Sequence, residues 1–162
     1  GRGAQMNAGA AAATSQILLF LHADTELPPD AAGEVARALE HPGVVGGCFR
    51  LRFDAKAPLL GVFAWFSRFE SRVSSFGDQA FFVDRRAFEE CGGFPEWPLL
   101  EDVELRRRLR RRGRFVKLRR SVVTSARRFL AEGALRRQLA NAAILLLHAL
   151  GAPPAKLARW YR

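Results

Sequence analysis

Residues 16–25 read Gln16-Ile17-Leu18-Leu19-Phe20-Leu21-His22-Ala23-Asp24-Thr25. The five apolar residues Ile17 to Leu21 predict a short strand that is buried on both faces, as in a parallel sheet between two layers of helices. Because ligands of open α/β sheets bind beyond the carboxyl ends of the strands, we expect His22 and Asp24 to face such a crevice. Asp24 is therefore the first candidate for a metal ligand, although a turn or a helix cap also explains an acid here.

Composition limits the class of protein. The 162 residues fit one domain, and 49% apolar residues with 13 Phe predict a packed core. The formal net charge of +10 attracts phosphates without choosing between nucleotides, nucleic acid and anionic lipid. Cys48 and Cys91 lack the spacing of a zinc or redox motif, and these residues include no signal peptide and no apolar run of transmembrane length. The expected location is cytoplasmic, and attachment to the inner face of the membrane is left open.

Helical and strand patterns alternate along the chain, which indicates an α/β fold. Strands are predicted at 44–54, 80–83, 115–118 and 122–123, and helices at 2–13, 30–40, 59–73, 85–91 and 103–112. The helix at 59–73 has a largely aromatic apolar face, and this pattern favours core packing over a groove for an acceptor substrate.

Two further acidic positions lie at the ends of predicted elements. Asp78 precedes a strand, and Glu101-Asp102 opens a basic helix, where the helix dipole alone explains acids. Transfer from a nucleotide-activated donor requires one acid to hold a divalent ion and another to deprotonate the acceptor hydroxyl. Oxygen ligands favour Mg²⁺ or Mn²⁺. Arg127 and Arg128 could bind a diphosphate, or they could be ordinary surface charge.

Two basic segments suggest other partners. The arginines of 103–112 resemble a nucleic-acid surface, but a buried Val-Leu stripe and the lack of interleaved aromatics favour a solvated helix face. We therefore expect no nucleic-acid partner. Residues 134–162 flank the apolar block 144–147 with basic residues; packing against the domain is favoured, and a peripheral membrane contact is left open.

Several motifs occur in a characteristic order: Gln5-Met6-Asn7-Ala8-Gly9-Ala10, Leu18-Leu19-Phe20-Leu21-His22-Ala23-Asp24, Gly77-Asp78-Gln79, Gly92-Gly93-Phe94-Pro95 and Glu101-Asp102. In this order and spacing the chain resembles a family 2 glycosyltransferase of the A-type nucleotide-diphospho-sugar fold. More narrowly, it resembles the bacterial branch known as radical-SAM/selenodomain-associated transferase 2, which is sometimes linked to arsenosugar synthesis. The resemblance covers nearly the whole chain. It implies a mixed sheet flanked by helices, with a catalytic domain at 1–130 and a C-terminal helical extension packed on it at 131–162.

The resemblance also implies roles for individual residues. Asp24 lies in the place of the family's Asp-x-Asp motif and would bind the metal ion at the donor diphosphate, whereas His22 replaces the first Asp of that motif, which usually contacts the ribose. Asp102 would be the catalytic base of an inverting transfer. Arg2, Gln5 and Asn7 fall in the segment that would line the nucleotide side, and Asp78 and Gln79 fall in the segment near donor and acceptor.

The family opens with a strand, a loop and a helix that carry much of the base-binding pocket, and this sequence begins downstream of them. We therefore expect this N-terminal unit to be missing, and the complete gene product rather than this chain alone to be the active enzyme. The expected activity is metal-dependent, inverting transfer of a sugar from a nucleotide-diphosphate donor to an acceptor hydroxyl. The alternative is a noncatalytic, Arg-rich domain that binds nucleic acid or an anionic membrane surface.

Overall fold

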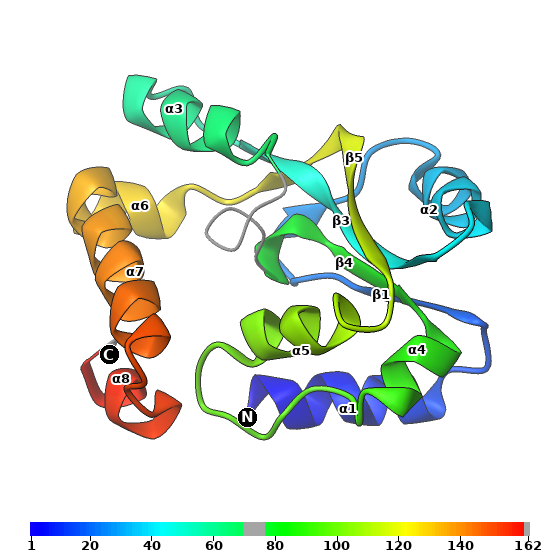
Figure 1. Cartoon of the computed structure of the whole chain (residues 1–162). Helices are drawn as coiled ribbons and strands as arrows, with labels where there is room; N and C mark the ends of the chain where they lie inside the picture. The colour runs from blue at the N-terminus through cyan, green and yellow to red at the C-terminus, as the bar shows by residue number, and fades with distance from the viewer. Residues whose placement is uncertain (70–76, 161–162) are drawn as a thin grey trace.

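A mixed five-stranded sheet forms the centre of the computed structural model, which describes residues 1–69 and 77–160 (Figure 1). The strands are β1 (Ile17–Phe20), β2 (Thr25–Glu26), β3 (Val44–Phe53), β4 (Phe81–Asp84) and β5 (Arg114–Thr124). Their order in the sheet is β1-β4-β3-β5-β2, in which only β3 and β5 pair in parallel. The predicted α/β fold with a sheet flanked by helices is confirmed.

Helices cover both faces of this sheet (Figure 1). One face carries α1 (Arg2–Ala12), α4 (Arg85–Glu90) and α5 (Glu101–Leu109), and the other carries α2 (Ala31–Glu40). Successive residues of a strand point to opposite faces, so Phe81 and Val83 join the first core cluster while Phe82 joins the second. The two apolar clusters together hold the strand ends in fixed positions.

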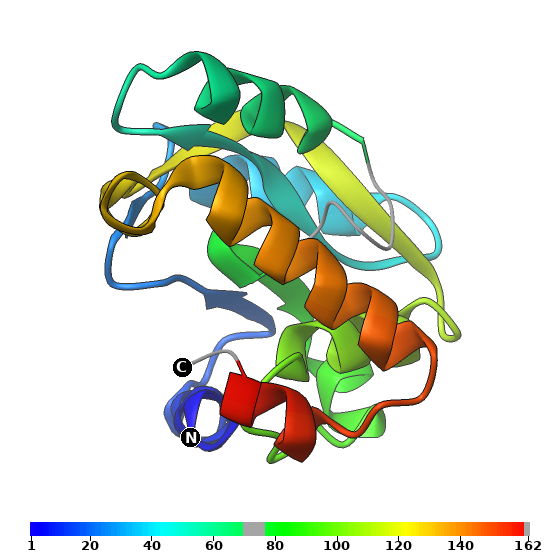
Figure 2. The ribbon, with the colours of Figure 1, turned by 90° about the vertical axis from the view of Figure 1, so that its left-hand side faces the viewer.

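The remaining helices are not part of these two helical layers, and the C-terminal helices form a separate group in Figure 2. These remaining helices are α3 (Pro58–Phe66), the 3-10 helix η1 (Gly77–Gln79), α6 (Arg127–Glu132), α7 (Ala134–Ala149) and α8 (Pro154–Trp160). The short helix η1 contacts β3 and β5. Ile144 of α7 and Leu157 of α8 are buried against Leu99 and Leu100, the residues that precede α5. This third cluster brings the C-terminal helices next to the start of α5. Within the described ranges, no helix combines the length and apolarity needed to cross a membrane.

The expectation that Ile17–Leu21 is a strand buried on both faces of a parallel sheet is wrong. The strand is present as β1, but its neighbour β4 is antiparallel, and only Leu18 of its four residues is fully buried. Among the described strands, β1 lies at the edge of the sheet and pairs with a neighbouring strand along one of its two edges. A short apolar run predicts a strand but carries no information about the direction or number of its neighbours.

Two other predictions need correction. The strands expected at 115–118 and 122–123 are one continuous strand, β5, because an irregularity in its register with β3 accommodates the intervening residues. The aromatic helix at 59–73 is present as α3, but its apolar face is not core: Leu60 is its one buried residue, and Phe66 is 56% exposed. Residues 70–73 of that prediction lie outside the described part of the chain.

Candidate active site

A pocket of about 210 Å³ opens between the loop after β1, the end of β5 and the first turn of α5. We call it the polar pocket. Six of the predicted site residues line it: Arg2, His22, Asp24, Asp78, Asp102 and Arg128. Asp24 is fixed there because its backbone oxygen accepts a hydrogen bond from the Ser125 amide at 3.1 Å, and the neighbouring Thr25 and Thr124 hydroxyls lie 2.8 Å apart.

Asp78 is the most strongly perturbed acid of the polar pocket. Its Oδ1 is buried and has no hydrogen-bond partner among the described residues. Burial raises the pKa of Asp78 to about 6; the His22 and Lys117 charges act in the opposite direction, whereas the Asp102 carboxylate adds to the rise. A buried carboxylate without a partner is stabilised when positive charge approaches it, either as a proton or as a cation.

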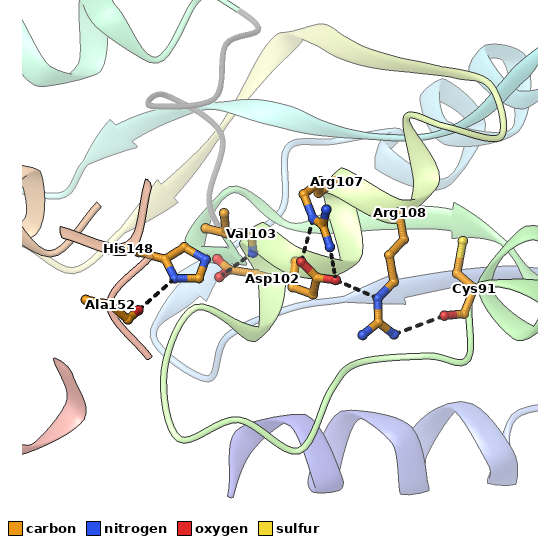
Figure 3. Close-up of polar contacts among 8 residues, drawn as sticks. Cys91, Asp102, Val103, Arg107, Arg108, His148 and Ala152 are labelled. Carbon is orange, nitrogen blue, oxygen red and sulfur yellow. Dashed lines mark hydrogen bonds and ion pairs between the residues drawn. The ribbon is translucent and has the colours of Figure 1, made fainter. Parts of the chain in front are cut away.

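The adjacent acids Glu101 and Asp102 lie in different surroundings. Leu100 adopts a left-handed conformation with φ 66°, and the helix then begins with Glu101 turned inward, 2% exposed. Glu101 Oε1 forms an ion pair with Arg2 Nη2 at 2.9 Å, and burial raises the pKa of Glu101, with the Asp102 charge adding to it. Asp102 lines the polar pocket, and its Oδ1 accepts a 2.8 Å hydrogen bond from the Val103 amide (Figure 3).

The arginines of α5 bind within the domain. Arg107 and Arg108 both donate to the buried carboxylate of Glu104, at 2.7–2.8 Å (Figure 3). These bonds are the main reason why the pKa of Glu104 is lowered. Arg106 is 3% exposed and lies over the Phe115 ring, so the expectation of a solvated face is wrong at this position. Guanidiniums held in this way are poorly placed to bind nucleic-acid phosphates.

Four other predicted site residues lie elsewhere. The Asn7 amide donates to the Phe94 carbonyl at 2.8 Å and accepts from the Phe94 amide at 2.9 Å, which ties α1 to the loop after α4. Gln79 is buried, and its Oε1 accepts hydrogen bonds from Cys48 and Lys117. Gln5 and Arg127 line a neighbouring hollow of about 830 Å³ along α1 and β1. That hollow shares Arg2, His22 and Asp24 with the polar pocket.

Sequence reasoning missed the contribution of α7 to the polar pocket. Arg137 and Asn141, one helical turn apart, line it beside Ile144 and Leu145. Arg137 Nη1 pairs with Glu132 at 2.9 Å. The signal was two polar residues at i and i+4 next to an apolar block, which places them on one side of the helix. The prediction placed residues 131–162 in an extension outside the catalytic domain and therefore assigned no pocket residue to them.

The pocket chemistry fits a divalent ion that substrate phosphates help to bind. Within residues 1–69 and 77–160, no three His, Cys, Asp or Glu side chains are arranged to hold a metal ion by themselves. Mg²⁺ is usually bound by only one or two carboxylates, and phosphates and water complete its shell. Asp24 and the unpartnered Asp78 Oδ1 offer anionic oxygens of this kind in one pocket.

A mixed sheet with acids and arginines beyond its strand ends defines an α/β protein suited to phosphate-bearing ligands. A family model described as "Glycosyl transferase family 2" matches residues 1–94, which is more than half of the chain, and the chain belongs to this family. Membership implies a sugar transferase with a nucleotide-sugar donor and an acceptor. The match includes Asp24 and Asp78 and ends before Asp102. Searches of curated proteins and of solved structures gave no match.

Proposed function

We propose that the protein transfers a sugar from a nucleotide-diphosphate donor to an acceptor hydroxyl, with inversion at the anomeric carbon and with help from Mg²⁺ or Mn²⁺. The observation that carries this proposal is the convergence of Asp24, Asp78 and Asp102, from three separate segments, on one pocket that also contains Arg2 and Arg128. Family membership supports the transferase class. The metal ion, the catalytic base and the inversion go beyond what family membership implies.

Donor binding is assigned to the side of the pocket formed by α1, β1 and α6. The diphosphate lies between Arg2 and Arg128, whose permanent charges suit phosphate oxygens, and the nucleoside extends toward Gln5 and Arg127 in the adjoining hollow. Asp24 holds the divalent ion. When bound, such an ion neutralises charge on the departing diphosphate.

Asp102 acts as the general base. Its carboxylate accepts the proton of the acceptor hydroxyl while the oxygen forms a bond to the anomeric carbon. The bond from that carbon to the diphosphate oxygen breaks, and its electron pair leaves with the nucleoside diphosphate. The hydrogen bond from the Val103 amide holds Asp102 in place for this proton transfer, and Asp78 adds negative charge nearby.

The test measures release of nucleoside diphosphate from a panel of nucleotide sugars by the complete gene product. We expect release with Mg²⁺ or Mn²⁺, loss after chelation, and loss in Asp24→Ala and Asp102→Asn. Glu40→Gln, an exposed acid at the end of α2, serves as the control and keeps full activity. Activity that survives in both pocket variants contradicts the assignment. The narrower radical-SAM branch, the cytoplasmic location and the membrane contact stay predictions from the sequence.

A further inference from the structure

The helices α3 and α7 lie next to each other (Figure 2), and an apolar groove of about 670 Å³ is lined by residues of both. We call it the α3–α7 groove. Its lining is mainly aromatic and aliphatic, and includes Leu51, Phe53, Phe63, Phe66, Phe129 and Leu146. Phe66 and Leu146 are 56% and 61% exposed, although both are large apolar side chains. Contiguous exposed apolar surface of this kind marks a binding site more often than a structural need.

The groove is continuous with the polar pocket. Asp78, Phe129, Asn141 and Leu145 line both of them, so the two spaces meet along α7. From this junction the groove follows α7 to Ala149. The lining residues of α7, from 138 to 149, span about 16 Å of helix. A long ligand can therefore place one end beside the acids and the rest in the groove.

Two polar groups of the groove, Ser67 and Gln79, are engaged within the protein, whereas Asp78 and Asn141 lie where the groove meets the polar pocket. Gln138 of α7 is a further polar residue of the lining. Ser67 Oγ accepts from the Leu51 amide at 2.9 Å and donates to the Ala64 carbonyl at 2.7 Å. Gln79 Oε1 accepts from Cys48 and Lys117. Along the aromatic and aliphatic part of the groove, a hydrophilic ligand such as a sugar chain would lose hydrogen bonds to water without gaining protein partners. An apolar chain loses no hydrogen bonds to water there, and the burial of its surface stabilises the complex.

The charge distribution fixes the orientation of such a ligand. Arg128 and Arg137 line the polar pocket at one end of the groove, together with Asp102, the proposed base. A polar head therefore belongs in the polar pocket, and an apolar tail belongs between the two helices.

We propose that the acceptor is an amphiphile whose hydroxyl-bearing head lies at Asp102 and whose apolar chain fills the α3–α7 groove. This inference rests on the function proposed above and adds the chemical class of the acceptor. The transfer step itself is unchanged: the head oxygen bonds to the anomeric carbon and its proton passes to Asp102.

Binding of alkyl β-D-glucosides of increasing chain length tests the groove without donor or metal. Calorimetric titration of the complete gene product, below the micelle concentration, should show affinity that rises by up to about fourfold for each added methylene. Methyl β-D-glucoside should bind too weakly to measure. An affinity that does not depend on chain length overturns the proposal, whether or not the protein releases nucleoside diphosphate.

Two neighbouring alanines of α7 provide a matched pair of variants. Both are exposed, but Ala142 lines the groove and Ala143 does not. Ala142→Trp should block the groove and abolish the chain-length dependence, whereas Ala143→Trp should bind like wild type. Thermal melting checks that both variants are folded, and Leu146→Ser replaces Ala142→Trp if the latter unfolds. Equal binding by the groove variant and its control contradicts the proposal.

The source of the amphiphile is distinguished with phosphatidylcholine vesicles that contain an alkyl glucoside. Co-sedimentation that Ala142→Trp weakens indicates a chain drawn from a bilayer, and binding of the monomers alone indicates a soluble amphiphile; both outcomes support the groove assignment. Nucleoside diphosphate release that fails while chain-length-dependent binding persists refutes the proposed transfer and leaves the groove as an apolar binding site. Transfer to glycerol as efficient as transfer to octyl glucoside refutes the acceptor class alone.

Discussion

The polar pocket and the α3–α7 groove share part of their walls but differ in how they are built. The pocket's acids lie beside strand ends and in the first turn of α5. The two apolar core clusters, one on each face of the sheet, hold the strands in place. The groove is formed by α3 and α7, each of which has a single buried residue, Leu60 and Ile144. The comparison teaches that the acids assigned to the chemistry lie on segments packed against the sheet. The proposed acceptor groove, in contrast, is formed by loosely packed helices, where substitution costs little stability.

The largest effect that separates the two regions is expected from Asp102→Asn. The amide keeps the shape of the side chain but cannot accept the acceptor's proton, so sugar transfer should fall by about 10²- to 10⁴-fold. Binding of octyl glucoside in the groove should stay within twofold of wild type. Initial rates and calorimetric titration measure the two quantities, and a loss of less than tenfold in rate would remove Asp102 from its role as base.

Asp78 lines both regions, and its ionisation should cost folding stability. The folded protein holds the Asp78 proton more tightly than the unfolded chain, because burial raises the pKa from 3.8 to about 6. Between pH 4 and 7, wild type should therefore lose about 2–3 kcal/mol of unfolding free energy relative to Asp78→Asn. Urea unfolding in chelator at both pH values measures this difference. Parallel pH profiles for the two proteins would contradict the buried, ionisable Asp78.

Arg2→Ala tests whether the pocket is held together from α1. It leaves the buried Glu101 carboxylate without its ion-pair partner, and we expect a loss of about 1–2 kcal/mol in unfolding free energy at pH 7. The effect is smaller than for a fully buried pair, since the Arg2 side chain is 55% exposed. Arg86→Ala, which breaks the surface pair with Glu90, should cost clearly less stability than Arg2→Ala. Equal losses in the two variants would mean that Glu101 does not need Arg2.

The smallest effect is expected from shortening one leucine of the groove. Leu146 and Leu139 are both 61% exposed on α7, but only Leu146 lines the groove. Leu146→Ala should weaken octyl glucoside binding by about threefold to tenfold because it removes apolar contact area, and Leu139→Ala should not. Neither should change the unfolding free energy by more than about 0.5 kcal/mol. If both variants bind alike, the groove does not hold the chain.

Local patterns in the sequence predicted the elements that carry the pocket's acids. An apolar run followed by Asp24 gave β1, and acids at the start of a basic segment gave α5 with Asp102. Both depend on short-range signals, namely apolar periodicity and the preference of helix N-termini for negative charge.

The parts that could not be predicted depend on long-range packing. Periodicity showed that the aromatic residues of α3 share a face, but whether that face is covered depends on α7, far along the chain. The direction of the neighbour of β1 and the entry of Arg137 into the polar pocket have the same origin. A single sequence specifies which residues share a side of an element more clearly than it specifies what lies opposite.

The most direct test of the pocket assignment is the binding of Mn²⁺ in the presence of a nucleoside diphosphate, followed by electron paramagnetic resonance. We predict that the complete gene product binds Mn²⁺ tightly only when a nucleoside diphosphate is present, and that Asp24→Ala weakens this binding at least tenfold while Glu40→Gln does not. Mn²⁺ binding that is as tight in Asp24→Ala as in wild type would contradict the placement of the metal and the donor diphosphate in the polar pocket.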